Sequence, residues 1–112
     1  MAARPAVFSE RGNHMRILRG IGTIKPEQRE AFLQAVNAIT QAARHDEGVI
    51  EHATYQSVED ANTFVMLEVY RDAAAQEQHN NQPHTRKFSA SLADFLAAPP
   101  DIKIMDGDWL TT

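Results

Sequence analysis

Apolar and polar residues alternate along several short stretches of this sequence, and such alternation predicts β-strands. The clearest stretch covers residues 63–70, most of whose side chains are β-branched, aromatic or long and apolar. One face carries Thr63, Val65, Leu67 and Val69, and the other carries Phe64, Met66, Glu68 and Tyr70. Glu68 is therefore a carboxylate within a strand that is otherwise apolar on both faces. We expect it to be paired, protonated or in contact with water.

The rest of the pattern divides the chain into strands and helices in a regular order. The predicted strands cover residues 16–24, 49–57, 63–70 and a short segment around Ile102 and Ile104. Helices are predicted where apolar residues recur every three or four positions. They cover residues 25–45, 73–79 and 85–96. Asp72 is the predicted cap of the short second helix, because its carboxylate can accept from the first free backbone N–H groups.

This order predicts an α+β protein with the ferredoxin-like split βαβ arrangement and an antiparallel sheet. Helices cover one face of such a sheet and leave the other face open. Because the strand at residues 63–70 is apolar on both faces, the open face needs a partner. We therefore expect a homodimer that forms through the sheet face.

Composition narrows the class of protein. The 112 residues contain no cysteine, so disulfides and thiolate chemistry are excluded. Residues 1–25 carry five basic residues and one acidic residue, whereas the remainder carries six basic and 14 acidic residues. An acidic body argues against nucleic-acid binding, and no apolar run approaches the ~18 residues of a membrane helix. We expect a cytoplasmic protein with residues 1–14 as a flexible extension and residues 15–112 as one domain.

The histidines and Glu68 are the candidates for chemistry. His79 closes the predicted second helix and is the candidate general base, because imidazole exchanges protons near neutral pH. Glu68 is the candidate group that orients it, and Arg19 and Arg71 are candidate partners of Glu68 in a structural ion pair. The alternative for His79 is a purely structural role, since a cation is favoured at a helix C-terminus.

Four further residues are predicted to contact a substrate. His84 follows Pro83 at a helix start, where it contacts the pocket or Glu68, or serves as a packing residue. His52 shares a polar strand face with Thr54 and Gln56, which is either solvated or lines a cavity. Tyr70 and Arg19 are the remaining two predicted substrate contacts. Arg19 is expected to bind an anionic group. No metal site is predicted, because His79 and His84 are five residues apart with Pro83 between them.

Gly20 and Gly22 share one face of the first predicted strand. Glycine within a strand lowers its stability, so two glycines on one face indicate that something approaches the backbone closely. Close packing of the helix layer explains the pair, and a small-molecule pocket above them is the alternative.

Over about residues 16–106 the chain resembles the antibiotic biosynthesis monooxygenase family of dimeric α+β barrels. The resemblance rests on Glu47-Gly48, on the run from Phe64 to Asp72, and on His79 followed by Pro83-His84. It implies a pocket in each subunit and oxidation of phenolic or quinol substrates by oxygen without metal or flavin. Tyr70 stands where the family often has Trp, and His52 where it commonly has Tyr.

We therefore expect a cofactor-independent monooxygenase acting on a quinol-like or phenolic small molecule, with His79 and Glu68 as its catalytic pair. One alternative is a non-oxidative isomerase of a small phosphorylated ketone, in which Arg19 holds the anion. Another is a dimeric ligand-binding or stress-associated protein without chemistry. The fold alone does not separate these three functions.

Overall fold

The computed structural model describes residues 14–110. The predicted flexible extension, residues 1–14, therefore lies outside the described residues except for His14. The elements in chain order are β1 (Met15–Thr23), a 3₁₀ turn η1 (Pro26–Gln28), α2 (Arg29–Ala43), β2 (Val49–Gln56), β3 (Thr63–Tyr70), α3 (Ala73–Asn80), α4 (Pro83–Phe95) and β4 (Asp101–Gly107). The predicted order of strands and helices is confirmed.

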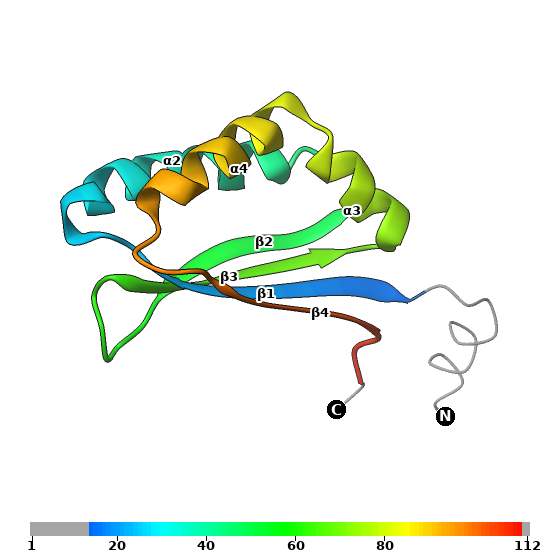
Figure 1. Cartoon of the computed structure of the whole chain (residues 1–112). Coiled ribbons are helices and arrows are strands. Elements are labelled where there is room, and N and C mark those ends of the chain that lie inside the picture. Colours follow the sequence, from blue (N-terminus) through cyan, green and yellow to red (C-terminus); the bar gives the residue numbers. More distant parts are fainter. Residues whose placement is uncertain (1–13, 111–112) are drawn as a thin grey trace.

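The four strands form one antiparallel sheet in the order β2-β3-β1-β4. This is the split βαβ arrangement of a ferredoxin-like fold, as predicted. The helices of the described residues all lie on one face of the sheet, and the opposite face is free of them (Figure 1). Within residues 14–110, no helix is both long and apolar enough to cross a membrane.

Strand register decides which side chains face the helices. His52 of β2 pairs with Glu68 of β3, and Glu68 pairs in turn with Leu18 of β1. Directly paired residues of an antiparallel sheet point to the same face, so these three side chains form one row across the sheet. The predicted face of Phe64, Met66 and Glu68 is therefore the face toward the helices.

Helix α2 packs on this face through side chains that recur mostly every three or four positions. Its buried residues are Phe32, Val36, Ile39, Thr40 and Ala43. Phe32 lies at the centre of the core, with its ring centroid 4.9 Å from that of Phe64 and 5.8 Å from that of Phe95. Aromatic pairs at such distances contribute about 0.5–1.5 kcal/mol each beyond the area they bury.

Of the helix ends that differ from the prediction, two matter for the site. Helix α2 ends at Ala43 and not at His45, so a turn containing Asp46 connects it to β2. Helix α4 begins at Pro83, two residues early, because proline is suited to the first turn of a helix. As a result His84 lies within the first turn of α4.

Gly48 allows the turn after α2 to pass close to α3. Its φ of +82° is in the left-handed region that favours glycine. A Cβ at this position would lie 2.5 Å from the Cβ of Ala75, which is shorter than any real contact. The glycine therefore brings the backbone next to Asp46 against the short helix that carries His79.

The sheet face without helices carries apolar side chains from its two central strands, including Ile17, Ile21, Val65 and Leu67. All four are partly exposed. The homodimer through this face remains a prediction.

Candidate active site

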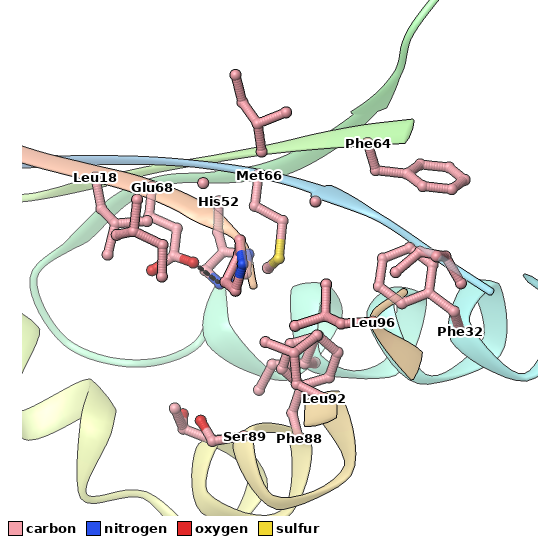
Figure 2. A pocket seen from close by; sticks show the side chains of 18 of the residues that line it. Leu18, Phe32, His52, Phe64, Met66, Glu68, Phe88, Ser89, Leu92 and Leu96 are labelled. Atoms are coloured by element: carbon pink, nitrogen blue, oxygen red, sulfur yellow. Dashed lines mark ion pairs between the residues drawn. The ribbon is translucent and has the colours of Figure 1, made fainter. Parts of the chain in front are cut away.

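A cavity of about 180 Å³ lies between the sheet and helices α2 and α4. One end is lined by aromatic and aliphatic side chains, and we call it the aromatic end: Phe32, Phe64, Phe88, Leu92 and Leu96. The other end, which we call the polar end, is lined by His52, Glu68, His79 and Thr85. Figure 2 shows the His52–Glu68 pair on one side of the cavity and the Phe32 and Phe64 rings on the other. The cavity can therefore hold an apolar molecule with one polar edge.

The two glycines of β1 both line this cavity but have different packing environments. A Cβ at Gly22 would lie 2.9 Å from Leu96 Cδ2, so this glycine makes room for the segment that follows α4. A Cβ at Gly20 would meet its nearest side-chain atoms at 3.9 Å, which is ordinary contact. Close packing thus explains Gly22, whereas Gly20 widens the cavity.

Glu68 is held at the polar end by Tyr70, its neighbour on the same face of β3. The Tyr70 hydroxyl donates a hydrogen bond to Glu68 Oε1. Tyr70 is fully buried, and its burial and the charge of Glu68 raise the pKa of its hydroxyl well above the usual value. The hydroxyl therefore stays protonated and remains a donor. The other carboxylate oxygen, Oε2, lies 3.7 Å from Nε2 of His52.

His79, near the C-terminal end of α3, is held by Asp46. Its Nδ1 lies 2.8 Å from Asp46 Oδ2. Burial alone would raise the pKa of Asp46, but hydrogen bonds from His79 and His84 outweigh burial and lower it. An ionised carboxylate only accepts hydrogen bonds, so Nδ1 of His79 carries the proton. A neutral ring in this tautomer has its lone pair on Nε2, which lies 3.4 Å from the Thr85 hydroxyl.

The same oxygen of Asp46 accepts a second hydrogen bond, from Nε2 of His84 at 2.8 Å. The Asp46 side chain is 10% exposed and that of His84 is 30% exposed. Hydrogen bonds to a charged group contribute about 1.5–3 kcal/mol each, which offsets the cost of removing the carboxylate from water. The His79–Asp46–His84 chain therefore runs from the cavity toward the surface.

His52 is 2% exposed and lines the cavity. Burial lowers its pKa, which makes it a neutral imidazole near pH 7. Its Nδ1 is buried and has no hydrogen-bond partner among the described residues. Its ring centroid lies 5.4 Å from that of His79. A buried polar atom without a partner is uncommon and often marks a functional position.

The structure brings together only part of the predicted site. His52, Glu68 and His79 line the cavity, whereas Tyr70 supports Glu68 from behind and His84 binds Asp46. One expected pairing was wrong, because the group that holds His79 is Asp46 and not Glu68. Of the alternatives for His84, contact with Glu68 is not the one observed, since His84 contacts Asp46.

Arg19 does not line the cavity. It lies on the opposite face of the sheet, where its Nη2 is 3.0 Å from Asp101 Oδ2. Arg19 is therefore not the partner of Glu68. Arg71 is not its partner either, because it contacts Glu47 and Asp72. The predicted anion-binding role of Arg19 therefore has no support from its position in the chain's own cavity.

Sequence reasoning missed Asp46 and Thr85. Asp46 lies 33 residues before His79, in a turn between two elements, and no periodicity marks it. The available signal was Gly48, since a glycine that needs positive φ indicates a tight turn with a fixed geometry.

Comparisons with known proteins agree with this fold. The family model of antibiotic biosynthesis monooxygenases matches residues 19–91. The Bacillus subtilis (strain 168) protein named "Putative monooxygenase YcnE" is 38% identical over 88 residues, which cover 79% of this chain and 93% of the relative. The crystal structure of PA3566 from Pseudomonas aeruginosa is similar with a TM-score of 0.73 and 28% identity, over 88% of this chain and 96% of that one. The structure of Rv0793 from Mycobacterium tuberculosis, at 21% identity, shares the fold with a TM-score of 0.77 over 81% of this chain and 92% of that one.

Proposed function

The chain belongs to the antibiotic biosynthesis monooxygenase family, and from this membership we propose a cofactor-independent monooxygenase that acts on a quinol-like or phenolic molecule. Family membership supports a monooxygenase-like function in general terms. The observation that carries the proposal is the Asp46–His79 pair at the polar end of an apolar cavity. Such a carboxylate–imidazole pair fixes the tautomer of the ring and leaves one nitrogen as a proton acceptor.

The cavity volume supports a substrate with one aromatic ring. An apolar cavity of about 150 Å³ in another protein is large enough to bind benzene. At about 180 Å³, this cavity has room for one ring and small substituents. Phe32, Phe64 and Phe88 would contact the ring, and a hydroxyl would face His79.

The proposed reaction starts with proton transfer from the substrate hydroxyl to Nε2 of His79. The resulting anion is electron-rich enough to give one electron to oxygen, and the radical and superoxide then combine to form a peroxide. Cleavage of its O–O bond leaves one oxygen atom on the ring and releases the other as water. Overall, a quinol and oxygen give a hydroxyquinone and water. In this proposal neutral His52, which lines the cavity, donates a hydrogen bond to the substrate oxygen as charge develops.

The test is oxygen consumption by chelator-treated protein with single-ring quinols and phenols, and with three-ring anthrones for comparison. His79→Gln removes the base and keeps a side chain of similar size. We expect turnover to fall by about 10²–10⁴-fold, which is the usual contribution of general base catalysis. His45→Ala, at an exposed position after α2, is the matched control and should keep full activity. Full turnover by His79→Gln would refute the role of His79 as the base.

The ligand-binding alternative is supported by the same apolar lining, because a cavity alone requires no reaction. Tight binding of a single-ring phenol without oxygen consumption or product would favour this alternative. The isomerase alternative depended on Arg19, which lies outside the cavity.

We also propose that the chain forms a homodimer through the sheet face that the helices leave open (Figure 1). Light scattering at micromolar concentration should give twice the mass of one chain. A monomer would mean that the partly exposed apolar residues of this face remain in contact with water, contrary to the proposal.

A further inference from the structure

The polar end of the cavity brings together three side chains that are typical metal ligands. A ring nitrogen of His52, a ring nitrogen of His79 and a carboxylate oxygen of Glu68 all lie within 4.8 Å of one another. They come from β2, α3 and β3, so three separate elements place them at one point. We propose that His52, Glu68 and His79 form a binding site for a divalent transition-metal ion of the Zn²⁺ type.

The spacing of these atoms fits a metal ion better than it fits a hydrogen bond. Nε2 of His52 and Oε2 of Glu68 are 3.7 Å apart, which is too long for a hydrogen bond. Ligands about 2.0–2.2 Å from a tetrahedral zinc ion are separated by roughly 3.4 Å. In addition, Nδ1 of buried His52 has no partner among the described residues. The ring of His52 is therefore not committed to another hydrogen-bond network.

Two of the three ligands are oriented from behind in the way that metal ligands usually are. A metal-binding histidine typically donates its other ring N–H to a carboxylate, and Nδ1 of His79 does so to Asp46. A metal-binding carboxylate is typically hydrogen-bonded as well, and Tyr70 donates to Glu68. These contacts leave Oε2 of Glu68 available to the ion, and Nε2 of His79 has only the Thr85 hydroxyl, 3.4 Å away, to exchange for it.

A second cluster of possible ligands consists of Asp46, His79 and His84. Its atoms are already joined by hydrogen bonds of 2.8 Å, because Asp46 Oδ2 accepts from both imidazoles. Among the described residues, no buried nitrogen of this cluster lacks a hydrogen-bond partner. The contrast favours the cavity cluster and provides the control for the experiment.

The metal site depends on the positions of the three side chains and not on the proposed oxygenation. The two functions nevertheless compete, because both use the lone pair on Nε2 of His79. Zinc bound there should inhibit a base-catalysed reaction and compete with the substrate for the polar end of the cavity.

The experiment is calorimetric titration of the chelator-treated full chain with zinc chloride, with circular dichroism to verify that each variant is folded. We expect one zinc ion per chain. Glu68→Gln, which keeps the side-chain volume, should weaken binding by more than the 10–100-fold that loss of an outer partner costs. Tyr70→Phe should weaken it by about 10-fold. His45→Ala should bind zinc as the wild type does. His84→Asn removes a ligand of the second cluster only and should weaken binding by no more than the loss of an outer partner does.

Three results would overturn the metal site. They are wild-type affinity in both Glu68→Gln and His52→Gln, loss of binding in His84→Asn, and absence of binding to the wild type. If His52→Gln fails to fold, Glu68→Gln alone decides the test.

Should zinc bind as expected but increase oxygen consumption, the metal site would stand and the cofactor-independent reaction would fall. Should the metal-free protein be active and bind no zinc, only the metal site would fall.

Discussion

Removal of the Asp46 carboxylate tests the network that holds His79. In Asp46→Ala the Nδ1–H of His79, on a side chain that is 3% exposed, loses its charged acceptor and keeps only the Thr85 hydroxyl at 3.3 Å. A hydrogen bond to a charged group contributes about 1.5–3 kcal/mol. The side chain of His84 is 30% exposed and can form a hydrogen bond with water instead, so its lost contact adds little to the free-energy cost of the substitution. We therefore expect the free energy of unfolding to fall by about 2 kcal/mol. For a domain of this size that lowers Tm by roughly 8–16 °C.

The effect of Asp46 also has a defined pH dependence. Because the two histidine hydrogen bonds lower the pKa of Asp46 below its ordinary value of 3.8, the folded state favours the ionised form. A lowered folded-state pKa contributes stability that is present above the unfolded-state pKa and is lost as pH falls through the folded-state pKa. The difference between wild type and Asp46→Asn should therefore be complete at pH 7 and decrease at pH values below about 4.

The assay is thermal unfolding followed by circular dichroism. Asp94→Asn and Asp94→Ala, at an exposed acid on α4, are the matched controls for loss of one negative charge. Nitrogen NMR of the His79 ring in Asp46→Asn gives a second measurement, because the wild-type ring should carry its proton on Nδ1. Equal melting temperatures for Asp46→Ala and Asp94→Ala, with an unchanged His79 tautomer in Asp46→Asn, would refute the reasoning.

Two further predictions concern the β1 glycines that line the cavity and Tyr70, which supports Glu68 from behind. Gly22→Ala places a Cβ 2.9 Å from Leu96 Cδ2 and should lower the free energy of unfolding by about 1 kcal/mol. Gly20→Ala should leave that free energy unchanged or raise it by about 0.5 kcal/mol. Equal free energies of unfolding for the two variants in denaturant titration would contradict the packing argument. Because burial and Glu68 raise the pKa of Tyr70, stability should be complete below pH ~10 and decrease as pH rises above that value. Tyr70→Phe should remove this decrease, and an equal alkaline decrease in the variant would contradict it.

The fold could be predicted from the sequence because its signals are local. The alternation over β3 gave its bounds, and Asp72 caps α3 as expected, with its Oδ1 2.9 Å from the Ala75 backbone nitrogen. Alternation along β1 was likewise sufficient to place Arg19 on one face of the strand and Gly20 and Gly22 on the other face. What it does not give is the register between strands, so the common face of His52 and Glu68 became visible only when β2 and β3 were paired.

The partner of His79 could not be predicted, because it depends on the path of a turn. Strand alternation places Glu68 on the correct face, but it does not decide which of two carboxylates is within hydrogen-bond distance of the imidazole. That choice is made by Gly48, whose positive φ and close approach to Ala75 bring the turn with Asp46 against α3. Sequence methods detect such a turn as a break and do not reveal which side chain it presents.

The two carboxylates hold different side chains at the polar end, and this arrangement is compatible with both proposals, a base and a metal ion. Asp46 binds Nδ1 of His79, so Nε2 has only the Thr85 hydroxyl beside it at 3.4 Å, while Tyr70 binds one oxygen of Glu68 and leaves the other facing His52. In both cases a hydrogen-bond partner fixes the functional group from the side away from the cavity. A lone pair held in this way accepts a proton or a cation with little reorganisation. If both proposals hold, occupancy of the polar end depends on the concentrations and affinities of substrate and metal, and zinc inhibition measured against substrate concentration reports that competition directly.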